Sequence, residues 1–352
     1  MRRDPGEGGA RIRIRAECER DLGLENPSHL CIASSTQTDR PDCASGIIRP
    51  MLTIAITGAS GFVGAALRER LTALGHRVLR LVRGDAAAAD AIAWDPQTGR
   101  IDMDKARTLD AVVHLAGENV AGGRWTAARK RAIRDSRGPA TEKLSRSLAQ
   151  LDKPPVLVSA SATGFYGDRG DEMLDERSAR GTGFLAEVAE EWERATEPLV
   201  QRGARVCLLR IGMVLGKDGG ALKKMLPPFR LGLGGPIGSG AQWTSWVALD
   251  DLCSAIAFLL TTESARGPYL CVSPKPVTNR DFTKALGRAV HRPALFPVPA
   301  FALLLMFGEM ADAVLLSSQR AMPRRLLEAG FRFVHEDVDD ALRTAIATQR
   351  AR

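Results

Sequence analysis

From Met51 onward, short apolar runs alternate with amphipathic stretches. Runs of strand length lie at residues 52–57, 77–82, 91–94, 111–115, 156–159 and 206–210. Patterns of helical period lie between several of them, at residues 62–74, 127–136 with 140–148, and 184–201. Strands that alternate with helices form a parallel sheet covered on both faces. The pattern therefore predicts an α/β fold built on a doubly wound parallel sheet.

The first 50 residues do not share this pattern. They mix Arg, Glu, Asp, Gly, Ser and Pro without a periodic apolar face, and their acidic residues argue against a transit peptide. We interpret residues 1–50 either as a flexible extension or as the product of a mis-assigned start, because Met51 opens the first strand pattern.

A glycine-rich turn, TGASGFVG at residues 57–64, joins the first strand to the first helix. Gly58 permits a tight turn, Gly61 removes a side chain where a pyrophosphate approaches the backbone, and Gly64 allows close packing of the helix. The helix N-terminus offers free N–H groups to phosphates. The strand before and the helix after make this a dinucleotide-binding turn of Rossmann type. The predicted contacts are Gly58, Ser60, Gly61, Phe62, Val63 and Gly64.

The end of the second strand indicates which dinucleotide binds. An acidic residue there would hold the ribose 2′-hydroxyl of NAD, but Arg83 follows the strand and suits the 2′-phosphate of NADP. Asp85 lies two residues further on and keeps NAD as the alternative. We therefore predict NADP as the cofactor.

Two further segments end strands at the same edge of the sheet, where ligands of open α/β sheets bind. The small residues Leu115, Ala116 and Gly117 follow one strand and are predicted to contact the cofactor. Ser159 and Ser161 end another strand, where their hydroxyls would face the nicotinamide or a substrate.

The segments TGASGFVG, VVHLAGENV, VSASATGFYG and RIGMVLG follow the order seen in extended short-chain dehydrogenase/reductases, which the chain resembles. It is most similar to an atypical "epimerase family" subgroup, described as nucleoside-diphosphate-sugar epimerase-like, through Arg124-Trp125, GFYGDRGD and the tail MPRRLLEAGFRF. The resemblance covers nearly all of residues 51–352. It implies an NAD(P)-binding Rossmann domain with substrate-side insertions at 51–290 and a small C-terminal domain at 291–352.

The chain departs from the family at the Tyr-x-x-x-Lys pair, in which Lys lowers the pKa of the Tyr that moves the proton. Phe184 and Val188 stand where the resemblance places Tyr and Lys. Tyr166 is therefore the candidate acid or base, acting with Ser159 or Ser161. The alternative is that Tyr166 only packs its loop.

Three more residues are candidates for the substrate side. Arg210 follows a strand and would bind a phosphate or carboxylate, or else form a structural ion pair. Trp243 and Trp246 lie in a polar, glycine-rich segment and would stack on a substrate ring, or else pack in the core.

Composition limits the kinds of ligand and binding partner that we expect. The net charge is +8, but Arg and Lys are scattered among acids, so we expect attraction for an anionic cofactor and no nucleic-acid partner. The six cysteines form no CxxC pair and no histidine lies at metal spacing, which predicts free thiols and no metal site. No uninterrupted apolar run reaches 18 residues, so we predict a cytoplasmic protein without a membrane partner. Related folds suggest a homodimer through residues 127–148 and 184–201.

These patterns support two hypotheses about function. The first is an NADP-dependent oxidoreductase or epimerase that acts on an unknown small substrate by hydride transfer at the nicotinamide. The second is a dinucleotide-binding regulator or redox sensor that has lost catalysis and acts through a protein partner. The missing Tyr and Lys favour the second hypothesis, and the predicted cleft favours the first.

Overall fold

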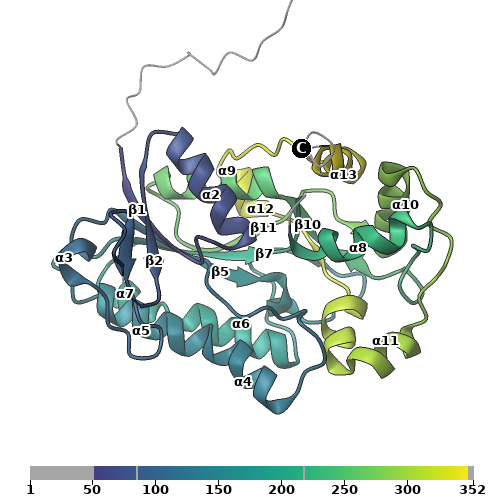
Figure 1. The fold of residues 1–352 in the computed structure, drawn as a ribbon, viewed down its shortest axis with the longest axis horizontal. Coiled ribbons are helices and arrows are strands. Elements are labelled where there is room, and N and C mark those ends of the chain that lie inside the picture. Colours follow the sequence, from purple (N-terminus) through teal and green to yellow (C-terminus); the bar gives the residue numbers. More distant parts are fainter. Residues whose placement is uncertain (1–50, 85, 217–218, 348–352) are drawn as a thin grey trace, which may run out of the picture. The chain divides into compact units, whose positions relative to one another are not determined.

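A computed structural model describes residues 51–84, 86–216 and 219–347, which belong to one compact unit, Pro50–Arg352. Residues 1–50 and Asp85 lie outside the described residues. A seven-stranded sheet in the order β11-β7-β5-β4-β1-β2-β3, with all neighbours parallel, forms the centre of the unit (Figure 1). Its strands are β1 Thr53–Thr57, β2 Arg77–Val82, β3 Ala91–Ala93, β4 Ala111–His114, β5 Val156–Ala162, β7 Val206–Ile211 and β11 Gly267–Cys271.

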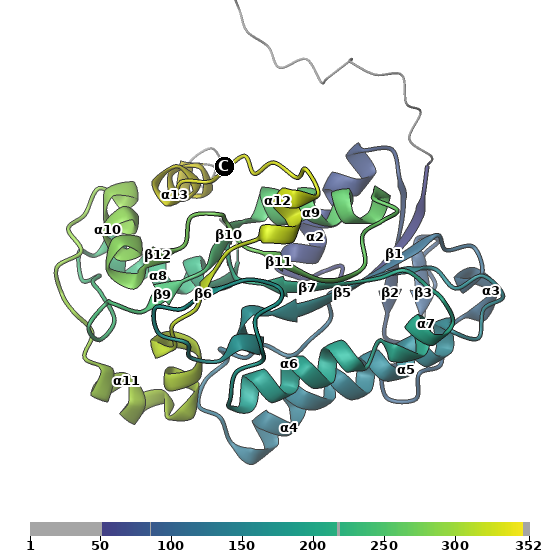
Figure 2. The ribbon, with the colours of Figure 1, turned by 180° about the vertical axis from the view of Figure 1, so that it is seen from behind.

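Helices cover both faces of the sheet, as Figures 1 and 2 show from opposite sides. One face carries α2 and α9, and the other carries α5, α6 and α7. The alternation of side chains along β1 fits this arrangement, since Ile54 and Ile56 enter the core shared with α2 and α9 and Ala55 enters the opposite core. These helices are α2 Phe62–Ala73, α5 Gly138–Leu148, α6 Phe184–Arg194, α7 Glu197–Gln201 and α9 Leu249–Thr261.

The predicted doubly wound parallel sheet is confirmed, with one difference among its helices. Residues 184–201 were predicted as one helix, but the chain forms α6 and α7 with a break at Ala195–Thr196. Pro198 lies in the first turn of α7, where its missing N–H costs nothing, whereas inside a continuous helix it would remove a hydrogen bond.

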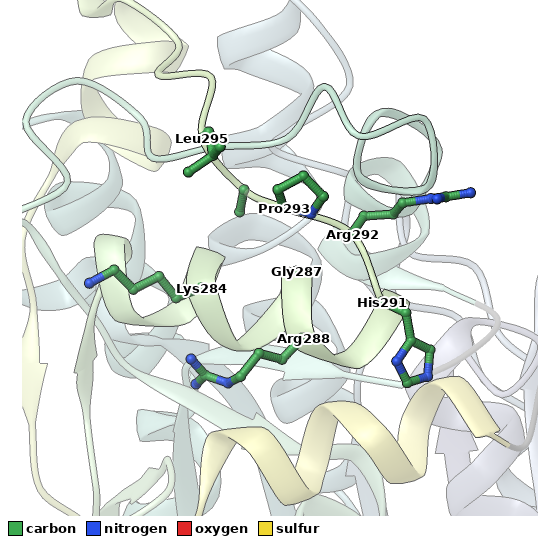
Figure 3. A pocket seen from close by; sticks show the side chains of 8 residues that line it. Lys284, Gly287, Arg288, His291, Arg292, Pro293 and Leu295 are labelled. Carbon is green, nitrogen blue, oxygen red and sulfur yellow. The ribbon is translucent and has the colours of Figure 1, made fainter.

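The chain after β7 builds a second core beside the carboxyl ends of the strands. Trp246 is fully buried there among α8, α10 and α13. Helix α10 is capped by His291, which has φ of +57°, and the following segment turns back along the helix (Figure 3). The helices of this region are α8 Gly220–Arg230, α10 Asn279–Val290, α11 Ala300–Phe307, α12 Arg324–Glu328 and α13 Val338–Ala347.

Short elements complete the described part of the chain. They are the helices α3 Met103–Ala106 and α4 Ala127–Asp135, the 3₁₀ helix η1 Thr163–Tyr166 and the π-helix η2 Ala311–Leu316. Three pairs of short strands are β6 Met173–Leu174 with β13 Arg320–Ala321, β8 Met213–Leu215 with β10 Trp246–Ala248, and β9 Trp243–Thr244 with β12 Val277–Thr278. None of the described helices combines the length and the apolar character needed to cross a bilayer.

Candidate dinucleotide-binding site

The glycine turn between β1 and α2 is held by close backbone contacts. Gly58 has φ of +67°, and a Cβ at this position would lie 3.1 Å from the amide nitrogen of Ala116. The Gly61 amide donates a hydrogen bond to the Gly58 carbonyl oxygen (2.9 Å). A Cβ at Gly64 would overlap that same carbonyl oxygen. The first turn of α2 therefore packs against the backbone of the turn itself, which explains the need for glycine at residue 64.

A cavity of about 730 Å³ opens beside this turn. It extends from the glycine turn to the ends of β2 and β4, the edge that the sequence predicted for a dinucleotide. Among the predicted cofactor contacts, the residues that line it are Gly58, Ser60, Gly61, Arg83, Ala116 and Gly117. The remaining predicted contacts lie outside its lining, namely Phe62, Val63, Gly64, Leu115 and Ser159.

Two side chains at the β2 end of the cavity have unused donors. Arg83 is exposed and makes no hydrogen bond or ion pair to any described residue, whereas the neighbouring Arg80 is paired with Asp90 (2.6 Å). Trp94 is 4 % exposed, and its indole N–H has no partner among the described residues. Buried donors are normally satisfied, so this wall suits a ligand that brings acceptor oxygens.

A buried histidine joins β4 to β1 and α5 beneath the cavity. Thr57 Oγ1 accepts hydrogen bonds from the amides of Leu115 and Ala116 (3.0 and 3.1 Å). Its own hydrogen is therefore directed at His114 Nδ1 (2.8 Å), and Nε2 carries the ring proton toward Thr141 Oγ1 (2.9 Å). Burial lowers the pKa of His114 from 6.5 to about 4, so the ring is neutral at physiological pH.

We expect acid to destabilise the fold through His114. Because the pKa in the folded state is depressed, the stabilisation is fully present above about pH 6.5 and is lost as the pH falls towards 4. The loss amounts to about 3 kcal/mol. Urea unfolding between pH 4 and 7 measures it, and His114→Gln should flatten that part of the profile. His291→Asn, at an exposed histidine, should leave the slope unchanged. An equal change in both variants would contradict the assignment.

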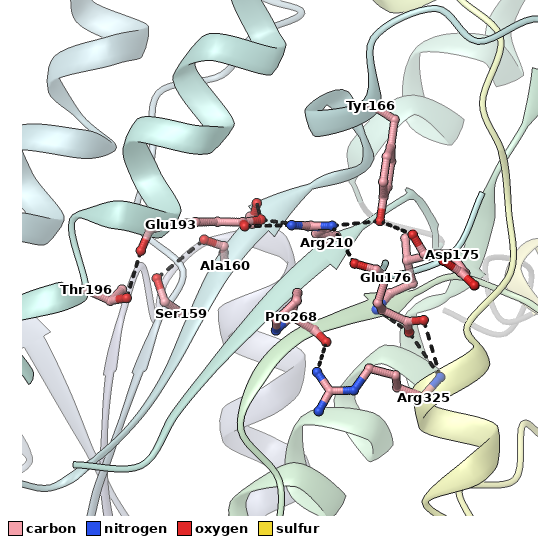
Figure 4. A network of polar contacts seen from close by, with 12 residues as sticks. Ser159, Ala160, Tyr166, Asp175, Glu176, Glu193, Thr196, Arg210, Pro268 and Arg325 are labelled. Atoms are coloured by element: carbon pink, nitrogen blue, oxygen red, sulfur yellow. Dashed lines mark hydrogen bonds and ion pairs between the residues drawn. The ribbon is translucent and has the colours of Figure 1, made fainter. Parts of the chain in front are cut away.

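Tyr166 and Arg210 lie in one buried network with Glu193 (Figure 4). The Arg210 guanidinium donates to both carboxylate oxygens of Glu193 (2.8 Å each) and to Tyr166 Oη (2.9 Å). Tyr166 Oη donates to the carbonyl oxygen of Asp175 (2.9 Å). Ser161 Oγ donates to Glu193 (2.8 Å). Arg210 thus forms the structural ion pair that the sequence left as one of two alternatives.

The surroundings of Tyr166 do not suit proton transfer near neutral pH. Its side chain is fully buried, and burial raises the pKa of its hydroxyl to about 12 despite the nearby Arg210. Ser159 is also fully buried within β5. The two positions that lack the family's pair are occupied by packing residues, since Phe184 contacts Trp125 edge-on and Val188 is buried. These contacts favour the alternative in which Tyr166 holds its loop.

The two candidate tryptophans have different surroundings. Trp246 is fully buried and its indole N–H donates to the carbonyl oxygen of Lys275 (3.1 Å), as a core residue does. Trp243 is half-buried, donates to Asp171 (2.7 Å) and lies under the guanidinium of Arg320 at 4.2 Å from the ring centroid. Neither side chain lines the cavity beside the glycine turn.

Arg137, at the junction of α4 and α5, was not assigned to the site from the sequence. A Cβ on Gly117 would lie 3.4 Å from its guanidinium carbon, which is 5.0 Å from the Trp192 ring centroid. Burial lowers the pKa of Arg137 to about 10, although Glu118 raises it in part. Only Nη1 donates to described residues, to the Ile133 carbonyl oxygen and to Ser136 Oγ. Its other N–H groups donate to no described residue, and the guanidinium lies next to Gly117, which lines the cavity, although Arg137 itself is not part of the lining.

A family model matches most of the described part of the chain. Residues 54–270 match the model described as "NAD dependent epimerase/dehydratase family". The chain belongs to this family. After this match, residues 298–345 match a second model, described as "Domain of unknown function (DUF1731)", which lies inside the predicted C-terminal region. The resemblance inferred from the sequence is thereby confirmed, while the boundary at residues 290 and 291 stays a prediction.

The similarity to known members of the family extends over most of this chain. It is 45 % identical over 289 residues to an epimerase family protein of Mycobacterium bovis, covering 82 % of this chain and 96 % of the relative. A crystal structure of the human epimerase family protein SDR39U1 with NADPH superposes with a TM-score of 0.76 at 30 % identity, covering 84 % of this chain and 99 % of that one. A crystal structure of a nucleoside-diphosphate sugar epimerase from Corynebacterium glutamicum superposes with a TM-score of 0.70 at 36 % sequence identity. The match covers 85 % of this chain and 59 % of that one.

Proposed function

We propose that the protein binds NADP(H) in the cavity beside the glycine turn and acts on a small substrate as an oxidoreductase or epimerase. The observation that carries this proposal is Arg83, a cation without a protein partner among the described residues that lines the cavity at the end of β2. A guanidinium at this place suits a 2′-phosphate. The human relative that was crystallised with NADPH supports the same choice of dinucleotide.

The order of the strands supports one placement of the dinucleotide among these residues. The N-terminus of α2 and the amides of the glycine turn on β1 would take the pyrophosphate, and Arg83 on β2 would take the adenosine half. The other half then extends toward β4 and β5, past Gly117 and Arg137. Bound there, the nicotinamide supplies the hydride chemistry, and the protein supplies position and electrostatics.

Arg137 is the group that we expect to contact the substrate. Its free N–H groups would hold a carbonyl or carboxylate oxygen, and the neighbouring Trp192 indole N–H also lacks a partner among the described residues. The prediction that Tyr166 with Ser159 or Ser161 moves the substrate proton stays open to test, but their burial speaks for a structural role. The substrate roles of Arg210, Trp243 and Trp246 likewise stay predictions.

We expect Arg83→Asp to weaken NADPH binding by about 10- to 100-fold, because a charge-assisted hydrogen bond is replaced by repulsion of the 2′-phosphate. NADH, which lacks that phosphate, should bind as before or more tightly. Calorimetric titration of the purified chain with both dinucleotides measures this difference. Arg77→Asp, at the exposed start of the same strand, is the matched control. An equal loss of affinity for NADH and NADPH would refute the assignment of Arg83.

A second candidate function is a regulator or sensor that binds NADP(H) without turnover. The observation that favours it is the replacement of the family's proton-transfer pair by the packing residues Phe184 and Val188. Tight NADPH binding without oxidation of NADPH by any of a broad panel of carbonyl substrates would support this function. The cytoplasmic location, the absence of a nucleic-acid partner and the homodimer through residues 127–148 and 184–201 stay predictions.

A further inference from the structure

Helix α11 exposes apolar side chains where a helix of a folded domain would normally bury them. All eight of its residues, AFALLLMF, are apolar, and only Leu303 is buried. Phe301 is 74 % exposed, Leu305 is 77 % exposed and Met306 is 62 % exposed. In both views α11 stands apart from the sheet and its covering helices (Figures 1 and 2).

The apolar surface continues into the segment before the helix. Leu295 and Phe296 are 73 % and 57 % exposed. The Phe296 amide donates to the Gly234 carbonyl oxygen (3.2 Å), which brings the exposed Leu231 and Leu233 alongside. We call this the α11 surface, formed by Leu295, Phe296, Phe301, Leu304, Leu305 and Met306. Exposed apolar side chains gathered on neighbouring segments in this way mark a contact site with a protein, a membrane or a ligand.

Basic residues border the α11 surface. A pocket of about 600 Å³ between α10 and the following segment is lined by Lys284, Arg288, His291 and Arg292 together with Leu295 (Figure 3). Arg288 is paired with Asp339 (2.7 Å), whereas Arg292 donates only to a carbonyl oxygen among the described residues, that of Arg230. At α11 itself, the exposed Arg124 donates to the Leu305 carbonyl oxygen (3.1 Å).

Acidic residues lie at the ends of the segments that form this region, as Glu309 does directly after α11, where it is paired with Lys130 (2.8 Å). Residues 219–249 contain three Lys or Arg, residues 282–308 contain three more, and neither segment contains Asp or Glu. A second copy of the chain seated on the α11 surface about a two-fold axis would bring two basic borders together, which disfavours association. An anionic surface would be attracted by the same border.

We propose that the α11 surface docks the protein on an anionic lipid bilayer. The apolar side chains would enter the boundary between headgroups and acyl chains, and Lys284, Arg292 and Arg124 would contact lipid phosphates and carboxylates. An exposed apolar helix with basic residues around it is typical of proteins that lie on a membrane without crossing it. The proposal revises the sequence-based prediction of no membrane partner, and it does not depend on the proposed catalytic function.

The test is co-sedimentation of the full chain with vesicles of phosphatidylcholine alone and of phosphatidylcholine with 30 % phosphatidylserine. We expect binding to the anionic vesicles, at least tenfold weaker binding to the neutral ones, and release by salt. Phe301→Gln with Leu305→Gln should reduce binding at least tenfold, as should Lys284→Gln with Arg292→Gln. Val334→Gln is the matched control, since Val334 is 76 % exposed outside the α11 surface.

Three outcomes would overturn the proposal. The first is an absence of binding to anionic vesicles, or binding that the α11 variants do not change. The second is self-association, seen in sedimentation velocity, that Phe301→Gln with Leu305→Gln abolishes, because it would assign the surface to a second copy. The third is salt-dependent binding to polyglutamate without binding to vesicles, because it would indicate an acidic protein partner. NADPH titration of each variant keeps this test separate from the cofactor site.

Discussion

Glu193→Ala is expected to destabilise the fold by about 3–5 kcal/mol, because it leaves the buried guanidinium of Arg210 without its carboxylate. The side chains of Arg210 and Glu193 are 5 % and 11 % exposed, so water cannot replace the lost partner. The carboxylate also accepts the hydrogen bond of Ser161, and the guanidinium supports Tyr166. The loss therefore reaches β5, β7, η1 and α6 together.

Urea unfolding measures this loss, and the same helix offers a control. Glu190 forms surface ion pairs with Arg180 and Arg194, so Glu190→Ala should cost less than about 1 kcal/mol. Combining Glu193→Leu with Arg210→Met should restore much of the stability, since a buried ion pair can be replaced by apolar side chains. A Glu193→Ala variant no less stable than Glu190→Ala would show that the network contributes little.

Gly64→Ala is expected to abolish measurable NADPH binding. The added methyl group would overlap the carbonyl oxygen of Gly58 and lie 2.9 Å from the Ala59 Cα, so the turn must move away from α2. Overpacking of this kind costs about 1–3 kcal/mol of stability. It also displaces the amides that would hold the pyrophosphate, for which we expect at least a 100-fold loss of affinity, about 3 kcal/mol.

Calorimetry with NADPH and a thermal unfolding curve test this expectation together. Gly138→Ala is the matched control, because Gly138 also lies in the first turn of a helix, α5, and a Cβ there meets its nearest neighbour at an ordinary 3.5 Å. We expect this variant to bind NADPH normally and to be as stable as the parent. Unchanged NADPH affinity in Gly64→Ala would disconnect the glycine turn from the cofactor.

The dinucleotide site was predictable because its determinants are local in the chain. Gly58, Gly61 and Gly64 lie within seven residues, and their spacing between a strand and a helix reports backbone requirements that few other structures share. The alternation of apolar runs predicted the parallel sheet for the same reason. The break between α6 and α7 was missed because the apolar pattern continues through Pro198.

The roles of the candidate residues beyond the glycine turn could not be predicted, because they depend on contacts between segments that are distant in the sequence. Arg210 and Tyr166 look like exposed functional groups in their own segments, but Glu193 and Asp175 meet them only when β7, η1 and α6 come together. Arg137 gained its place beside Gly117 in the same way. A charged or aromatic side chain can be a ligand contact or a core partner, and only the residue opposite decides which.

The sequence by itself determined the sheet, the glycine turn, the family and the candidate cation Arg83, because each is specified by residues that are neighbours in the chain. Only the tertiary structure decided that Tyr166, Ser161 and Arg210 join one network through Glu193, that His114 is buried and neutral, and that most side chains of α11 are exposed in the part of the chain that the structure describes. Burial is a property of everything that packs around a residue, and an apolar helix has the same sequence pattern whether or not another surface covers it.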